Sequence, residues 1–430
     1  MQKLNRRTFV AGVGSAFAAM GANDRINVAV VGVRGRGREH IQVYAAEKRV
    51  RIAAICDIDT AQIERAVAQT RSLGQSDPKT YQDFRKLLED RDIDAVSIAT
   101  PNHWHALQTI WACQAGKDVY VEKPASHSIW EGRKMVEAAR KYNRIVQIGM
   151  QSRSLKHKQR AVQLLREGVI GEVYMAKGIC YKRRKAIGQA PDGSPPLGVD
   201  YDIWRGPAAQ RPFNEKRFHY NWHWFWDTGN GDIGNQGIHE MDIARWGLGV
   251  GHLPKRVHST GGLFGYRDQE TPNTQIAEFE YGNALLVFEV RGLLTNTEGT
   301  IGLRPDGYVG NLFYGSEGWM SIDSEDFQVH LGEKGEVAQR MRFQEPRRTD
   351  TTPHIENFLD AVRSRNYKDL NGDVLEGHLS AALVHMANIS YRTGRKLTFD
   401  AATETFVNDP EANQFVRDKY RSPYVVPEKI

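Results

Sequence analysis

Short apolar runs and longer amphipathic segments alternate along the first 150 residues. The apolar runs are rich in β-branched side chains and predict buried parallel strands at 26–31, 50–55, 95–100, 119–121 and 145–148. The segments between them have helical periodicity and predict helices from residue 38 and at 59–70, 83–88, 106–115 and 130–142. This alternation predicts an α/β domain with a doubly wound parallel sheet, a Rossmann domain, over residues 23–150.

The pattern changes after residue 150, where strand-like segments follow one another. A helix is predicted at 159–167. Alternating apolar and polar positions predict strands at 172–181, 256–260, 274–280, 284–290, 312–314 and 319–322. Consecutive strands form mostly antiparallel sheets, so we predict a second, α+β domain with a large open sheet over residues 151–397. Helices are predicted at 354–364 and 374–391, and the tail, 398–430, packs on this chain or on a neighbouring one.

The composition is that of a globular protein of two domains, apart from its first 22 residues. Of the 430 residues, 40% are hydrophobic and 26% are charged. Arg6 and Arg7 precede a short apolar run at 10–20, which is typical of a Tat export signal and too short to span a membrane. We therefore expect a periplasmic or otherwise exported protein, with cleavage near Ala22. An amphipathic or disordered N-terminus is the alternative.

Charge and cysteine usage exclude several classes of function. Part of the net charge of +6 belongs to the predicted signal, and the basic clusters at 156–160 and 182–185 accompany no nucleic-acid motif, so we expect no nucleic-acid partner. The three cysteines are widely spaced in apolar surroundings and predict buried thiols: Cys56, Cys113 and Cys180. Two histidines at 103 and 105 lack a third ligand in a recognisable pattern, so we predict no metal site.

A glycine-rich turn follows the first predicted strand. Gly32, Gly35 and Gly37 allow a tight turn and a close approach of the backbone to a pyrophosphate. Arg34 and Arg36 lie in the same turn, and the helix that follows directs its positive N-terminus at the phosphates. The spacing departs from the usual dinucleotide fingerprint, so this motif needs support from the rest of the chain.

That support comes from Asp57, which directly follows the second strand. A carboxylate at this place accepts hydrogen bonds from the ribose hydroxyls of a dinucleotide and repels a 2′-phosphate. The sequence therefore favours NAD over NADP as the cofactor. A helix N-cap is the other role open to Asp57.

Lys123 lies at the carboxyl end of the strand 119–121, between Glu122 and Pro124. Ligands of open α/β sheets bind at this edge, so a lysine there is a candidate for chemistry. Thr100 and Asn102 follow the neighbouring strand and belong to the same edge. The alternative is an exposed lysine beside a turn.

A glycine-led segment in the second half carries a second candidate. If the chain is helical from about residue 236, His239 and Asp242 share one face, with Asn235 a turn earlier. A histidine beside carboxylate and amide groups is a natural proton acceptor, although a structural role is open as well.

The insert at 183–230 is rich in aromatic residues. Flat amphipathic rings such as Trp222 and Trp226 suit the apolar faces of sugars, but an interface or a local core suits them equally. We count four residues as candidate substrate contacts: Arg153, Trp222, His223 and Trp226.

Together these motifs resemble the glucose-fructose oxidoreductase and inositol dehydrogenase family (Gfo/Idh/MocA) from about residue 26 to 395. The matching pieces are the glycine turn, Thr100-Pro101-Asn102-x-x-His105, Glu122-Lys123-Pro124 and the glycine-led helix with His239. The resemblance implies that the first domain binds NAD or NADP, that the open sheet builds homo-oligomer contacts of a dimer or tetramer, and that substrate lies between the domains.

The resemblance also implies roles for single residues. The cofactor would be contacted by Thr100, Asn102, His105, Glu122 and Lys123. Lys123 would also hold the reacting hydroxyl, and His239 would be the acid/base. Many dehydrogenases of the family carry aspartate where this chain has Asn235, and its loss lowers the basicity of the histidine unless Asp232 or Asp242 supplies the missing charge.

Three functions fit these observations. The first is an NAD-dependent oxidoreductase acting on a secondary hydroxyl of a sugar or polyol, which we adopt. The second is a redox-neutral glycosidase that oxidises a sugar transiently, eliminates the aglycone and reduces the ring again. The third is a non-catalytic sugar- or cofactor-binding protein. An exported enzyme has no obvious soluble pool to reoxidise NADH, so we expect a tightly bound cofactor that is regenerated in the active site.

Overall fold

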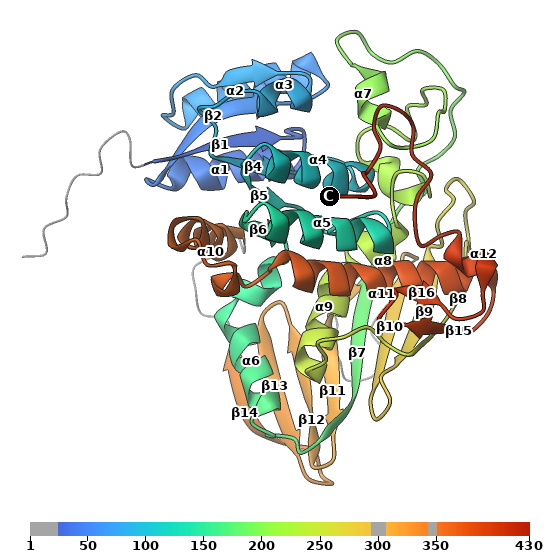
Figure 1. The fold of residues 1–430 in the computed structure, drawn as a ribbon. Helices are drawn as coiled ribbons and strands as arrows, with labels where there is room; N and C mark the ends of the chain where they lie inside the picture. Colours follow the sequence, from blue (N-terminus) through green and yellow to red (C-terminus); the bar gives the residue numbers. More distant parts are fainter. Residues whose placement is uncertain (1–24, 294–306, 343–350) are drawn as a thin grey trace, which may run out of the picture.

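The computed structural model describes residues 25–293, 307–342 and 351–430, which form two sheets with helices packed around and between them (Figure 1). The predicted export signal lies outside the described residues. Within that part of the chain, no helix is both long enough and apolar enough to cross a membrane. All three cysteines are buried free thiols, as predicted.

The first domain is built on a six-stranded parallel sheet with the order β3-β2-β1-β4-β5-β6. Its strands are β1 (Ile26–Val31), β2 (Val50–Cys56), β3 (Lys79–Tyr81), β4 (Ala95–Ile98), β5 (Asp118–Val121) and β6 (Val146–Ile148). The order reverses at β1, which pairs with both β2 and β4. The carboxyl ends of β1 and β4 therefore flank the crevice where such sheets bind ligands, and the predicted Rossmann domain is confirmed.

Five helices connect these strands: α1 (Arg36–Ala46), α2 (Thr60–Ser72), α3 (Phe84–Leu88), α4 (Asn102–Gln114) and α5 (Ile129–Lys141). The sequence predicted a turn up to residue 105, but α4 begins at Asn102. Pro101 directly precedes the helix. Proline is tolerated there because an N–H at the start of a helix has no partner within the helix. The first turn of α4 is buried, so contacts from distant segments stabilise a turn of helix that the local sequence does not signal.

The second domain contains a ten-stranded sheet with the order β14-β13-β12-β11-β7-β10-β9-β8-β15-β16. Its strands are β7 (Val173–Lys182), β8 (Arg256–Gly262), β9 (Thr274–Glu280), β10 (Leu285–Arg291), β11 (Gly307–Gly315), β12 (Gly318–Asp323), β13 (Asp326–Leu331), β14 (Glu336–Arg342), β15 (Leu397–Asp400) and β16 (Thr405–Phe406). β7 and β10 pair in parallel, and the other described pairs are antiparallel, which confirms the mostly antiparallel sheet.

Four strands of this sheet were not predicted. β13 and β14 form one end of it, and residues 336–341 of β14 are exposed, so this edge strand has no apolar face to signal it. β15 and β16 form the other end and extend the sheet beyond the predicted domain boundary at residue 397.

Helices pack on one face of the large sheet. α6 (Lys156–Arg166), α9 (Gly237–Leu248) and α11 (Val374–Thr393) contact its strands, and α11 also packs against α5 of the first domain. In Figure 1, α11 crosses between the Rossmann domain and the large sheet. α11 therefore fixes the two domains against each other.

Two C-terminal segments return to the first domain. α10 (Thr351–Ser364) buries Ile355, Phe358 and Leu359 in the core formed with β1 and β2. The tail also packs on this chain, because Tyr424 lies 5.3 Å from the ring of Trp104 on α4. The C-terminal part of the sequence thus completes the Rossmann domain.

Candidate active site

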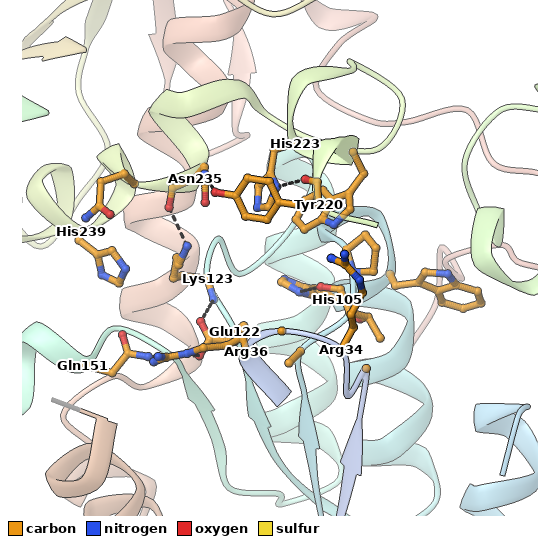
Figure 2. Close-up of a pocket in the computed structure, with 18 of the residues that line it drawn as sticks. Arg34, Arg36, His105, Glu122, Lys123, Gln151, Tyr220, His223, Asn235 and His239 are labelled. Carbon is orange, nitrogen blue, oxygen red and sulfur yellow. Dashed lines mark hydrogen bonds and ion pairs between the residues drawn. The ribbon is translucent and has the colours of Figure 1, made fainter. Parts of the chain in front are cut away.

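A cavity of about 1280 Å³ lies between the two domains, at the carboxyl ends of the first sheet's strands. Figure 2 shows its centre. Most of the predicted site residues line it: Gly32, Arg34, Gly35, Arg36, Asp57, Thr100, His105, Glu122, Lys123, Trp222, His223, Asn235 and His239. The remaining five lie outside the cavity wall: Gly37, Asn102, Arg153, Trp226 and Asp242.

The turn between β1 and α1 forms one wall. Gly32 has a φ of +81°, and a Cβ there would approach the carbonyl oxygen of Ala99 to 2.7 Å, so the turn requires glycine. Gly35 opens on the cavity with nothing within 4 Å of an added Cβ, and the amides that begin α1 follow it. Backbone amides at the start of a helix favour a phosphate anion, and the exposed Arg34 adds positive charge.

Asp57 lies in the same wall, beyond the end of β2. Its carboxylate accepts hydrogen bonds from the N–H of Val33 at 2.7 Å and of Asp59 at 3.0 Å. Burial raises the pKa of Asp57 to about 6, although these two hydrogen bonds act to lower it. The alternative role as an N-cap belongs to its neighbour, since the Asp59 side chain accepts the N–H of Ala61 at the start of α2. The Asp57 carboxylate is therefore available to accept hydrogen bonds from the hydroxyls of a ribose.

Glu122 is buried behind Lys123 and anchors the glycine turn. It accepts hydrogen bonds from Arg36 Nε at 2.8 Å and from Gln151 Nε2 at 3.2 Å, and His40 Nε2 lies 3.1 Å away. Burial alone would raise the pKa of Glu122, but the Arg36 guanidinium holds it well below its usual range. A permanent negative charge thus lies directly behind the lysine.

Lys123 extends into the cavity from the end of β5. Its Nζ donates a hydrogen bond of 2.7 Å to the main-chain oxygen of Asn235, as Figure 2 shows. Burial lowers the pKa of Lys123 to about 8, although the charge of Glu122 opposes this shift. A substantial fraction of the amine is therefore neutral near pH 8 and can accept a proton.

His239 faces the same part of the cavity from α9. Its Nδ1 is buried and has no hydrogen-bond partner within the described residues. Burial, and then the charge of Lys123, lower the pKa of His239 to about 3. The imidazole is therefore neutral and has a nitrogen available for a ligand.

Neither candidate carboxylate compensates for Asn235. Asp232 pairs with Arg184 at 2.7 Å, and Asp242 pairs with Arg153 through bonds of 2.7 and 2.8 Å. Asp242 and Arg153 are both buried away from the cavity, so they hold α9 in place instead of facing the ligand. The sequence placed Asp242 in the site because α9 carries His239 and Asp242 on neighbouring parts of its surface, and the predicted substrate contact of Arg153 is replaced by this buried pair.

The other three residues outside the cavity also have structural partners. Gly37 packs so closely that an added Cβ would lie 2.1 Å from the oxygen of Gly32. Asn102 Nδ2 donates to Asn230 Oδ1 of the second domain at 2.9 Å. Trp226 lies beneath the guanidinium of Arg392, with 5.0 Å between group and ring centroid.

His103 and His105 support the site through backbone contacts. The two nitrogens of His105 lie 2.7 Å from the Pro124 oxygen and 2.8 Å from the Thr100 oxygen, which ties the loop after β5 to the end of β4. His103 faces the oxygens of Thr228 and Trp204. Because all four nitrogens face carbonyl oxygens, these rings position the loops around Lys123.

The aromatic insert closes the cavity from the side of the second domain. It contains α7 (Tyr201–Arg205), and it meets the first domain where Thr60 N–H donates to the Gly198 oxygen at 3.1 Å. Trp222 lines the cavity with its ring stacked 3.6 Å from His223. Other rings of the insert form a small core of their own: Trp204, Phe213 and Phe218.

Sequence reasoning missed several residues of the cavity. Tyr220 accepts a hydrogen bond of 3.2 Å from Asn235 Nδ2, and His219 and Glu240 line the wall nearby. Only the aromatic composition of the insert signalled Tyr220. Glu240 follows His239 directly, but the search for a shared helix face favoured Asp242.

Residues 26–150 match the oxidoreductase family Gfo/Idh/MocA in its NAD-binding Rossmann fold, and residues 182–259 and 324–426 match its C-terminal alpha/beta domain. The chain belongs to the Gfo/Idh/MocA family. Its first domain is therefore an NAD-binding Rossmann domain, and the glycine turn, the start of α1 and Asp57 fit the dinucleotide. When bound, that cofactor supplies a hydride acceptor or donor.

Curated proteins that the chain resembles are named glycosyl hydrolase family 109 proteins. The protein of Saccharopolyspora erythraea is 30% identical over 165 residues, 37% of this chain and 36% of its own length. That of Shewanella sp. strain W3-18-1 is 30% identical over 154 residues, 35% of this chain and 34% of its own. The match thus spans about a third of the length of these relatives.

Solved structures share the fold of the Gfo/Idh/MocA chain. The WlbA dehydrogenase of Bordetella pertussis, in complex with NADH and UDP-GlcNAcA, has a TM-score of 0.65 at 20% identity and covers 87% of this chain and 99% of its own. The aldose-aldose oxidoreductase of Caulobacter crescentus, complexed with glycerol, has a TM-score of 0.66 at 18% identity, over 87% and 100%. At these identities the likeness establishes the common architecture.

Proposed function

We propose that this Gfo/Idh/MocA protein is an exported oxidoreductase that transfers hydride between a secondary hydroxyl of a sugar or polyol and an NAD that stays bound. The observation that carries the proposal is the convergence of Lys123 and His239 on one cavity from two domains. NAD is favoured over NADP because the Asp57 carboxylate repels a 2′-phosphate. The twin arginine at 6 and 7 supports export.

Lys123 and His239 have different roles toward the reacting hydroxyl. The Lys123 amine, with a pKa of about 8, takes the hydroxyl proton onto Nζ as the hydride leaves the carbon. The His239 imidazole, with a pKa of about 3, stays neutral in this step and orients the hydroxyl by a hydrogen bond. This division differs from the one that the family resemblance implies, in which His239 is the acid/base.

Redox-neutral glycoside cleavage is the second candidate, and the names of the curated relatives favour it. It uses the same hydride transfer and returns the hydride to the product, so it also operates with a bound cofactor. A non-catalytic binding protein fits less well. Binding alone does not require a buried lysine with a pKa of about 8 beside an unpartnered imidazole nitrogen, whereas proton transfer does.

The protein is further proposed to form a homo-oligomer, a dimer or tetramer, through the large sheet. Ile276 on β9 and Leu285 on β10 are 39% and 44% exposed on the strands of that sheet. A second copy that covers these apolar side chains would remove them from water. Sedimentation of the purified protein tests this, and a monomer at all concentrations would contradict it.

Mass spectrometry of the supernatant after denaturation tests the proposed function. We expect released NAD from protein purified without added cofactor. The absence of nicotinamide there, together with no binding of added NAD, would refute the proposal. Fresh protein is then incubated with nitrophenyl glycosides without added NAD. Release of the aglycone selects the glycosidase, and bound NAD without release selects hydride exchange between sugars.

A further inference from the structure

Glu240 follows His239 on α9 and lines the same cavity, and the hydride step leaves it without a role. The side chain is only 4% exposed, and its Oε2 is buried with no hydrogen-bond partner among the described residues. A buried polar oxygen without a partner is energetically unfavourable. Such a group calls for an explanation, and a ligand bound in the cavity provides one.

Hydrogen bonds from neighbouring elements hold the backbone around Glu240. Its carbonyl oxygen accepts a hydrogen bond of 2.7 Å from Asn311 Nδ2 on β11, in the large sheet. The Gln236 side chain, just before α9, accepts a hydrogen bond of 3.1 Å from Lys182 Nζ. The backbone of Glu240 is therefore held in the cavity wall, next to His239.

The groups that face the Glu240 carboxyl come from three elements. Lys158 on α6 and Lys182 at the end of β7 are the positive charges, Cys180 on β7 is a buried thiol, and Gln236 lies on the preceding turn. Burial raises the pKa of Glu240 to about 8, although Lys158 opposes the shift. The carboxyl group is thus mostly protonated at neutral pH and can donate its proton.

We propose that Glu240 is the acid that protonates the departing oxygen of a glycoside in this cavity. The inference rests on the proposed function in its glycoside-cleaving form. It assigns the part of the cavity beside Glu240 to the leaving group, and the part between Lys123 and His239 to the sugar that is oxidised.

The chemistry balances with the residues present. The hydride step leaves a ketone and a charged Lys123, and this charge beside the carbonyl oxygen acidifies the neighbouring C–H. The His239 imidazole, which is neutral up to this point, takes the C–H proton in this second step. The electron pair forms a C=C bond, the C–O bond to the leaving group breaks, and the Glu240 carboxyl gives its proton to the departing oxygen. Water then adds its hydroxyl at the vacated carbon and a proton to Glu240, while His239 returns its proton to carbon. The returning hydride and the proton held on Lys123 restore the alcohol, so the net reaction is hydrolysis.

The test compares two glycosides of one sugar, a methyl glycoside and a nitrophenyl glycoside, with Glu240→Gln. A methoxide leaving group needs protonation, whereas nitrophenolate leaves without it. In a single turnover, before water adds, we expect release of the leaving group to slow about 100-fold with the methyl glycoside and little with the nitrophenyl glycoside. Glu131→Gln is the matched control, since Glu131 is also buried with a raised pKa of about 8 but lies outside the cavity.

The pH profile of the wild type provides a second measurement that needs no variant. Single-turnover release of methanol from the methyl glycoside should fall as the pH rises through about 8, and release of nitrophenolate should lack this decline. Equal losses on both glycosides, no loss on either, or identical profiles would overturn the assignment. Reduced nicotinamide without any aglycone from the wild type would overturn this inference alone, and the absence of both would overturn the proposed function with it.

Discussion

Lys123, two residues beyond the end of β5, donates a 2.7 Å hydrogen bond to the main-chain oxygen of Asn235 at the end of α8 (Gly231–Asn235), and this bond joins the two domains inside the cavity. The acceptor belongs to the backbone, so it persists whatever side chain occupies position 235. It keeps the amine beside His239 before substrate binds. A sugar hydroxyl that engages Lys123 must share or replace this bond, which couples substrate binding to the contact between the domains.

Replacing Asn235 by aspartate tests the electrostatics of His239. A carboxylate near the ring favours the imidazolium, so Asn235→Asp should raise the pKa of His239 by about 1 unit or more from its value of about 3. The ring titration is followed by NMR. Asn235→Ala removes the side chain without adding charge and should leave the titration nearly unchanged. Equal titrations in the aspartate and alanine variants would contradict this explanation.

The rate of the hydride step should rise with pH. The neutral amine of Lys123 accepts the hydroxyl proton, and its pKa is lowered to about 8 by burial. The rate should therefore increase up to about pH 8 and level off above it. Single-turnover formation of reduced nicotinamide measures this step. A rate that is flat between about pH 6 and 9 would show that another group takes the proton.

Asp242→Asn should lower the stability of the fold and leave the turnover nearly unchanged. Asp242 pairs with Arg153 and accepts a 2.6 Å bond from Ser380 in the interior. Breaking a buried ion pair costs about 3 to 5 kcal/mol. The free energy of unfolding, measured with denaturant, should therefore fall by about that amount. We expect turnover per folded subunit to change less than twofold, roughly the scatter for a residue outside the site. Lost turnover at unchanged stability would place Asp242 in the reaction.

Asp77→Asn is the control for that experiment. Asp77 and its partner Arg71 are exposed, and a pair of this kind contributes at most about 1 kcal/mol. The free energy of unfolding of this control should therefore be close to that of the wild type.

A buried histidine ties the C-terminal tail to the loop after Lys123. Nδ1 of His127 lies 2.8 Å from the Asp418 carboxylate. Burial disfavours the charged ring, but Asp418 outweighs it and raises the pKa of His127 to about 9. This stabilisation is fully present below the ordinary pKa of 6.5 and is lost as the pH rises through about 9.

His127→Asn tests this tie. Thermal unfolding of the wild type should lose stability between about pH 7 and 9 relative to the variant. The difference between the two proteins should be largest below about pH 6.5. A difference that does not vary with pH would contradict the charged pair.

The ends of the parallel strands could be predicted from the sequence. β-branched runs that stop at glycine, acid or proline mark where a buried strand leaves the sheet, and this placed Gly32, Asp57 and Lys123 in one cavity. These signals are local, so they do not depend on how distant segments pack.

The surroundings of His239 depend on such packing and could be predicted only in part. His239 and Asp242 are about 60° apart around α9, and the sequence cannot show where the cavity ends between them. Arg153 and Ser380, from distant segments, take Asp242 out of the cavity, while Glu240 stays in it. The start of α4 at Asn102 was likewise set by burial against segments far along the chain.

Absorbance of reduced nicotinamide on mixing purified protein with sugar, with no cofactor added, tests the central claim most directly. We predict that the wild type forms the reduced species in a single turnover. Lys123→Met should retain bound NAD and form it at least about 100-fold more slowly, while Lys86→Met, on the exposed surface, should match the wild type. Equal rates in the wild type and Lys123→Met, with the same NAD content, would contradict the account.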